Sequence, residues 1–202
     1  MPLRAALLLL LLAAGCAAPP VQNGRAAIVD ILSVEPSIVL DIRYATANNF
    51  TGQVLYPAAK AKLRREAAES LAAVQRELKM MGLGLKVYDA YRPLAIQWKL
   101  WEVVSNPSYV ADPRKGSRHN RGAAVDLTIV DSLGAELEMP TPYDDFTEKA
   151  SQSYEELPER VKRNRALLRD VMERHGFLRI QSEWWHFDFH GWEQFPVMDE
   201  PL

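Results

Sequence analysis

Cysteine is almost absent from this chain: of its 202 residues only one is a cysteine, Cys16, and it lies near the N-terminus. A single cysteine excludes an intramolecular disulfide, and it also excludes a closed structural zinc site of the thiolate-rich kind. A metal site in the body of this chain must therefore be built from nitrogen and oxygen ligands.

An excess of basic residues is also lacking. The chain has 24 Lys and Arg against 26 Asp and Glu, which gives a formal net charge of −2. Such a balance predicts neither a nucleic-acid footprint nor a polybasic membrane patch. We expect no nucleic-acid partner, and small molecules or peptides fit the composition better.

The N-terminus differs in composition from the rest of the chain. Arg4 precedes the apolar run 7–12, and Ala13, Ala14 and Gly15 lead into Cys16. The run is too short to span a bilayer as a mature helix, and the segment resembles a bacterial lipoprotein signal peptide. We therefore expect a signal peptide at 1–15, an acylated cysteine and tether at 16–26, and a folded domain at 27–202. The protein would be exported, periplasmic and anchored through Cys16, which is its only expected membrane contact. An ordinary secretory signal is the alternative, because Ala13 stands where lipoprotein signals usually have Leu.

The pattern of apolar residues predicts one α+β domain with a small, mainly antiparallel sheet flanked by helices. Gly82 is a suitable end for the longest helix, and Pro93 and Pro158 are suitable helix starts. The stretch 131–157 is an irregular loop long enough to carry function. The expected strands are 27–34, 38–44, 85–90, 123–130 and 185–189, and the expected helices are 59–81, 94–104 and 158–176.

Two segments about sixty residues apart contain the ligands of a catalytic metal site. The first supplies His119 and Asp126, and the second supplies His186 with Glu183 three residues before it. Two imidazoles and one carboxylate leave a coordination position for water, as in hydrolytic zinc sites. Taken singly, each residue has an ordinary interpretation as a surface histidine, a salt-bridged aspartate or a core histidine. The combination is harder to explain in that way.

The spacing also constrains the local geometry. Seven positions separate His119 from Asp126, so the chain must turn back near Gly122 to bring them together. Alternation in the strand 123–130 predicts that Asp126 points away from the packed side. Residues three apart on a regular strand face opposite sides, so Glu183 must lie in a bend before the last strand, or the strand must bulge.

Asp188 and His190 share the strand face of His186. They could orient a metal ligand. An equally good interpretation is that both are exposed strand residues without such a role.

The linked motifs Ser117-x-His119-x-x-Gly-x-Ala-x-Asp126 and Glu183-x-x-His186 resemble those of the zinc-dependent D-alanyl-D-alanine dipeptidases, the VanX-like members of peptidase family M15. The similarity extends through Tyr-Asp-Ala-Tyr-Arg-Pro at 88–93 and covers most of the expected domain. The resemblance implies a Hedgehog/DD-peptidase-like zinc fold with one Zn²⁺ per chain. It also implies roles for particular residues: His119, Asp126 and His186 as ligands, Glu183 as general base, and Arg92 near the scissile carbonyl.

Other candidate roles stay open at the level of sequence. Arg92 has an alternative role in a salt bridge with Asp89 at a helix start. Ser117 could bind the substrate or shape its turn, and Asp144 or Asp145 could hold the substrate ammonium group.

The expected reaction is hydrolysis of free D-alanyl-D-alanine to two molecules of D-alanine. One alternative is a D,D-carboxypeptidase or endopeptidase acting on peptidoglycan stem peptides. Another is a zinc-binding domain without turnover, against which Glu183 and Arg92 argue because neither is needed merely to hold a metal.

Overall fold

The computed structural model describes residue 24 and residues 26–202. The predicted signal peptide and the acylation of Cys16 lie outside these residues. No helix within the described part of the chain is long and apolar enough to cross a membrane.

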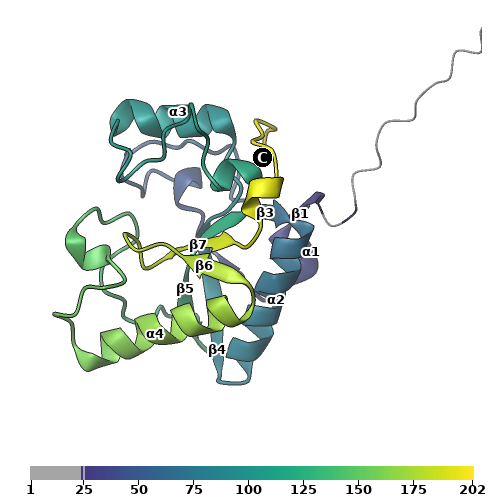
Figure 1. The fold of residues 1–202 in the computed structure, drawn as a ribbon. Helices are drawn as coiled ribbons and strands as arrows, with labels where there is room; N and C mark the ends of the chain where they lie inside the picture. The colour runs from purple at the N-terminus through teal and green to yellow at the C-terminus, as the bar shows by residue number, and fades with distance from the viewer. Residues whose placement is uncertain (1–23, 25) are drawn as a thin grey trace, which may run out of the picture.

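A five-stranded sheet forms the centre of the molecule (Figure 1). Its strand order is β2-β4-β5-β7-β6, with β2 parallel to β4 and the other neighbours antiparallel. The mainly antiparallel α+β fold predicted from the sequence is confirmed. The strands are β2 (Val39–Leu40), β4 (Leu83–Asp89), β5 (Ala124–Asp131), β6 (Phe177–Arg179) and β7 (His186–Phe189).

Helices and a two-stranded ribbon complete the fold. In Figure 1, α2 and α4 lie against the sheet, while α3 lies away from both at the top of the view. The ribbon pairs β1 with β3 in antiparallel fashion. These elements are β1 (Ile28–Asp30), β3 (Lys62–Arg64), α1 (Ile31–Val34), α2 (Arg65–Lys79), α3 (Leu94–Val103) and α4 (Glu159–Arg174). Short 3-10 turns are η1 (Arg43–Ala45), η2 (His119–Arg121), η3 (Glu148–Ala150) and η4 (Trp192–Gln194).

The predicted helix 59–81 is correct in its centre and wrong at its start. Ala67, Leu71, Val74 and Leu78 form its buried stripe, as the helical spacing requires. Residues 62–64 are strand β3 instead of helix, because they pair with β1. A buried Leu63 satisfies a strand and a helix equally well, so periodicity does not separate the two.

The predicted first two strands are also too long. β1 ends at Asp30, whose side chain accepts a hydrogen bond from the backbone N–H of Leu32 at 2.9 Å and so begins α1. β2 is two residues long and is followed by η1. β6 was not predicted, because a strand of three residues shows no usable alternation.

Strand β5 is buried on both faces, which corrects the prediction for Asp126. Val125 and Leu127 lie on one face and Asp126 and Thr128 on the other, but all four are buried. The second face is covered by Tyr143, whose ring stacks on another tyrosine at 4.7 Å and whose hydroxyl bonds Asp126. The Asp126 carboxylate is thus inside the protein.

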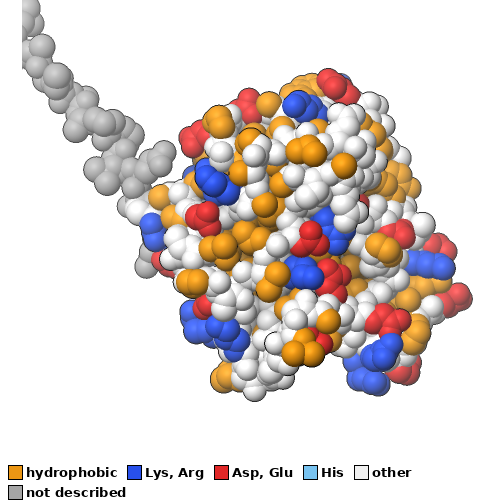
Figure 2. Space-filling model, turned by 180° about the vertical axis from the view of Figure 1, so that it is seen from behind, with side chains coloured by type: hydrophobic (Ala, Val, Ile, Leu, Met, Phe, Trp, Pro, Cys, Tyr) orange, Lys and Arg blue, Asp and Glu red, His pale blue; other side chains and the backbone are white. Residues whose placement is uncertain are grey.

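The opposite side of the molecule carries a mixed surface. Figure 2 shows basic and acidic side chains scattered among apolar ones on this face. Interspersed charges of both signs produce no broad field of one sign over the visible face.

Gly122 makes the turn between η2 and β5 possible. Its φ is +66°, and its N–H donates to the carbonyl of His119 at 3.0 Å. A Cβ at this position would collide with Cδ1 of Ile28 and lie 3.4 Å from the backbone nitrogen of Arg64. The left-handed conformation therefore favours glycine, and a Cβ would also force the end of the Ile28 side chain to move.

We predict that Gly122→Ala lowers the free energy of unfolding by about 2–5 kcal/mol. The strain of alanine in a left-handed conformation and the overpacking by its Cβ both destabilise the folded state. Gly134→Ala is the matched control: its φ is +82°, but a Cβ there meets nothing within 4 Å. Strain alone should cost the control about 1–2 kcal/mol. Urea unfolding of both variants measures the difference, and equal losses would contradict the packing argument.

Candidate active site

Three side chains from three separate elements converge on one point. His119 comes from η2, Asp126 from β5 and His186 from the first residue of β7. Asp126 and His186 are direct partners across the antiparallel strands. Their potential ligand atoms all lie within 4.8 Å of one another, and all three side chains are buried. The structure therefore brings together the three residues that the motifs predict as ligands.

The spacing of these atoms suits a tetrahedral cation. Nε2 of His119 lies 3.2 Å from Nδ1 of His186 and 3.4 Å from Oδ1 of Asp126, and the last two atoms are 2.9 Å apart. Four-coordinate zinc with bonds of about 2.0–2.1 Å holds its ligand atoms about 3.3 Å apart. Two imidazole nitrogens and a carboxylate oxygen at this separation match zinc in chemistry and in size.

The remaining ring nitrogens of the two histidines have acceptors of their own. Nδ1 of His119 lies 2.7 Å from the carbonyl of Ala90, and Nε2 of His186 lies 2.8 Å from Oδ1 of Asp188. A proton on each of these nitrogens leaves the other nitrogen with a lone pair that faces the site. Asp188 therefore orients His186. The alternative candidate, His190, is exposed and contacts the carbonyl of Gly176 instead.

Buried charges perturb the titration of the site. Burial alone would raise the pKa of Asp126, but the neighbouring His119 and His186 hold it well below its usual range. Burial alone would lower the pKa of His186, but Asp126 and Asp188 raise it well above its ordinary value. In the metal-free protein each of the two residues thus favours the charged form of the other.

Glu183 lies beside the three ligands without joining them. It sits in the irregular segment directly before β7, so the bend that the spacing required is present. Its Oε2 is 3.9 Å from Nδ1 of His186, and burial raises its pKa above the usual value. A carboxylate with a raised pKa at this distance is a suitable proton acceptor for a water held among the ligands.

Arg92 is held rigidly at the edge of the site. Its Nε and Nη2 donate to Oδ2 of Asp89 at 3.0 and 2.7 Å, and its Nη1 donates to Gln97 at 2.8 Å. Burial opposes its charge, but Asp89 keeps the pKa of Arg92 above its ordinary value. These bonds use three of the five guanidinium protons and leave two N–H groups for the cavity. The salt bridge weighed from sequence is present, and it leaves the guanidinium able to bind a ligand.

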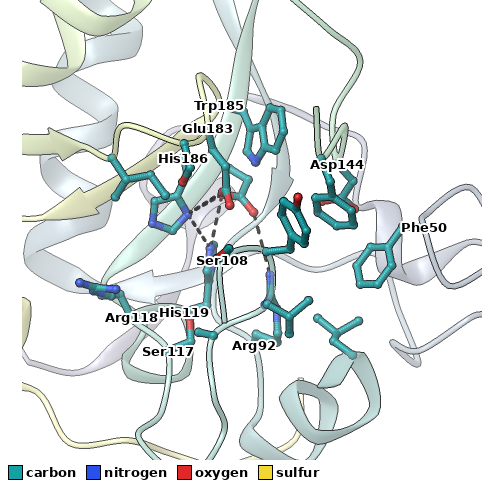
Figure 3. A pocket seen from close by; sticks show the side chains of 18 of the residues that line it. Phe50, Arg92, Ser108, Ser117, Arg118, His119, Asp144, Glu183, Trp185 and His186 are labelled. Atoms are coloured by element: carbon teal, nitrogen blue, oxygen red, sulfur yellow. Dashed lines mark hydrogen bonds and ion pairs between the residues drawn. The ribbon is translucent and has the colours of Figure 1, made fainter. Parts of the chain in front are cut away.

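A cavity of about 300 Å³ is lined by the three ligand residues, by Glu183 and by Arg92 (Figure 3). Ser117 and Arg118 lie on one side of it and Asp144 on the other. Ser117 is buried, and its Oγ accepts the backbone N–H of His119 at 3.2 Å, so it shapes the turn while lining the cavity. Asp145 does not line this cavity, and its carboxylate accepts the backbone N–H of Thr147 at 2.8 Å.

Asp144 enters the cavity because its backbone is left-handed, with φ of 60°. Aspartate tolerates this region better than most residues. Its Oδ2 accepts a hydrogen bond from the hydroxyl of Tyr44 at 3.2 Å, and burial together with Asp126 raises its pKa well above the usual value. A neighbouring cation would therefore stabilise the ionised form of the Asp144 carboxylate.

Comparison with known proteins agrees with this geometry. The sequence model of the D-ala-D-ala dipeptidase family, Peptidase M15, matches residues 25–199. The chain belongs to this family. The family resemblance predicted from the motifs is confirmed.

Relatives named D-alanyl-D-alanine dipeptidase come from several bacteria. One from Escherichia coli (strain K12) is 37% identical over 171 residues, covering 85% of this chain and 89% of that protein. One from Enterococcus faecium is 30% identical over 172 residues, covering 73% of this chain and 83% of that protein. A solved structure of VanYB in complex with D-alanine-D-alanine covers 68% of this chain and 77% of its own, with a TM-score of 0.45 and 16% identity.

One supporting residue of this M15 chain was not found from sequence. Tyr143 donates its hydroxyl to Oδ2 of Asp126 at 3.0 Å and so binds the carboxylate oxygen that does not face the two histidines. It lies in the irregular loop 131–157, whose length alone indicated function. No local pattern identified the tyrosine, because its contact with Asp126 depends on how the loop folds back.

We predict that zinc affinity falls as the pH is lowered, because zinc must displace the proton that Asp126 and Asp188 stabilise on His186 in the metal-free form. The raised pKa moves this competition to a higher pH than for an unperturbed histidine. Zinc titration at several pH values, with calorimetry in buffers of different ionisation enthalpy, measures the released proton.

Asp188→Asn tests the cause of this dependence. Removing one of the two carboxylates should move the fall in affinity to lower pH, while the loss of orientation weakens zinc binding by about 10–100-fold. An unchanged pH profile in this variant would show that Asp188 does not control His186.

Proposed function

We propose that this chain is a zinc-dependent dipeptidase that hydrolyses free D-alanyl-D-alanine to two molecules of D-alanine. The observation that carries the proposal is the convergence of three nitrogen and oxygen ligands, with Glu183 and Arg92 on the same small cavity. The names of relatives that align with most of this chain support the choice of substrate. One set of possible metal ligands found among the described residues supports one zinc ion per chain.

His119, Asp126 and His186 would hold the zinc. When bound there, zinc polarises a carbonyl oxygen and lowers the pKa of water to about 7. Glu183 takes a proton from the attacking water and passes it to the leaving amine. Its raised pKa favours the first step, because a less acidic carboxyl has a more basic carboxylate, while the carboxyl group stays acidic enough to protonate an amine.

Arg92 stabilises the charge that develops on the carbonyl oxygen. Its two free N–H groups are directed by the bonds to Asp89 and Gln97, so little reorganisation is needed during the reaction. A fixed guanidinium stabilises an oxyanion more than it stabilises the neutral carbonyl of the ground state.

The cavity suits a small zwitterion. Asp144 at one side would accept the substrate ammonium group, and Ser117 with the nearby Arg118 would bind its carboxylate at the other (Figure 3). An approaching ammonium group also favours the ionised form of Asp144, whose pKa is raised in the free protein. A blocked terminus loses one of these contacts and adds atoms to a small space, which disfavours longer substrates.

We also propose that the protein is an exported, periplasmic lipoprotein anchored at Cys16. The support is the order of Arg4, the apolar run 7–12 and the small residues before Cys16. Such an enzyme would act on dipeptide released from the cell wall, either for nutrition or in wall metabolism. Incorporation of labelled fatty acid into the full chain, and its loss in Cys16→Ser, tests the anchor.

The central test of function is D-alanine release from free D-alanyl-D-alanine and from its N-acylated form, each with and without a chelator. We expect cleavage of the free dipeptide alone, sensitive to the chelator and restored by zinc. Preference for the acylated substrate would support a carboxypeptidase instead, and failure to cleave either would support a zinc-binding domain without turnover.

We predict that Glu183→Gln strongly lowers the rate of hydrolysis while zinc stays bound, because the amide cannot accept a proton and the three ligands are untouched. The activity should fall by about 10²–10⁴-fold, the usual contribution of a general base. Metal content by atomic absorption and turnover of the free dipeptide are measured on the same preparation. Loss of zinc in this variant would show that Glu183 is a ligand.

A further inference from the structure

The active-site cavity adjoins a second hollow. This hollow has a volume of about 260 Å³ and is lined by residues of the loops that carry Tyr109, Phe146 and Glu183. Tyr109 and Phe146 line both spaces, so they form part of the wall between them. The role of this wall is not accounted for by metal binding or by proton transfer.

The wall consists of stacked aromatic rings from different loops. The rings of Tyr109 and Phe146 are 5.0 Å apart and nearly parallel, with an interplanar angle of 28°. Phe50 packs edge-on against Phe146 at 5.2 Å, and Figure 3 shows Phe50 at the same side of the cavity as Asp144. Three loops far apart in sequence therefore meet at one end of the cavity. Such aromatic pairs stabilise a contact by about 0.5–1.5 kcal/mol beyond the area they bury.

Local backbone structure positions the two stacked residues. The backbone N–H of Tyr109 donates to the carbonyl of Asn106 at 3.0 Å. Phe146 follows the left-handed turn at Asp144 by two residues. The same turn thus places the carboxylate in the cavity and the ring at its end. A substrate whose ammonium group meets Asp144 would have any N-terminal extension directed at this ring pair.

We propose that the stacked pair Tyr109–Phe146 is the element that restricts this enzyme to substrates with a free amino terminus. The inference rests on the proposed dipeptidase function and adds the residues that enforce its specificity. Opening the pair joins the cavity to the adjoining hollow, which then receives an N-acyl group or one preceding residue. Neither ring belongs to the metal ligands, to Glu183 or to Arg92, so its removal leaves the hydrolytic side chains present.

The test compares the zinc-loaded full chain with Tyr109→Ala and Phe146→Ala on three substrates. These are D-alanyl-D-alanine, its N-acetyl form and glycyl-D-alanyl-D-alanine, with kcat/KM measured from D-alanine release. Two variants serve as controls. Tyr109→Phe keeps the ring, and Trp98→Ala removes an aromatic side chain that is 42% exposed, against 43% for Tyr109, and that lines neither space.

Both alanine variants should raise the ratio of kcat/KM for extended over free substrate by at least about tenfold, the effect of a difference of about 1.4 kcal/mol in transition-state binding. Both controls should keep the wild-type ratio. The inference is overturned if the alanine variants cleave the free dipeptide but retain the wild-type ratio, or if Trp98→Ala raises the ratio equally. Should Phe146→Ala fail to fold, the more exposed Tyr109→Ala decides. A wild-type protein that does not cleave the free dipeptide instead refutes the proposed function.

Discussion

Burying a carboxylate without a partner costs free energy. This fold buries three carboxylates near one cavity, those of Asp89, Asp126 and Asp188. Each has a compensating group. Asp89 accepts bonds from Arg92 and Tyr56, while Asp188 binds His186. Asp126 is compensated by imidazoles that must be protonated to carry charge. A divalent cation at their meeting point would supply that charge permanently, so the need to neutralise Asp126 and the ability to hold zinc have one physical origin.

The antiparallel pairing of β5 and β7 supplies the geometry for this compensation. Asp126 and His186 face each other across the ladder, where opposite residues lie close enough for direct contact. A slip of β7 by one residue would turn His186 to the other face, away from Asp126, and disrupt the site. His119 reaches the same point only because Gly122 reverses the chain before β5 begins. Backbone register and one left-handed glycine therefore determine where the three ligand atoms meet.

Sequence predicted the features that depend on local spacing. The turn at Gly122, the bend before His186 and the stripe of α2 each follow from a short segment with its own period or constraint. It did not predict β3 or β6, which are too short to show a period, or the burial of Asp126. That burial, the bond from Tyr143 and the different directions of Asp144 and Asp145 depend on how the loop 131–157 folds over the sheet. No pattern within the loop encodes those contacts.

The salt bridge of Arg92 and its proposed role in catalysis depend on the same arrangement of side chains. From sequence, a salt bridge with Asp89 and a role near the carbonyl were alternatives. In the structure the salt bridge and the bond to Gln97 remove the freedom of a long side chain and leave two N–H groups directed by fixed partners. An arginine free to rotate would lose entropy on meeting an oxyanion, whereas this one has lost it on folding. The buried ion pair is therefore what would prepare Arg92 for its proposed role in catalysis, and the stability of the whole fold offsets the free energy of burying it.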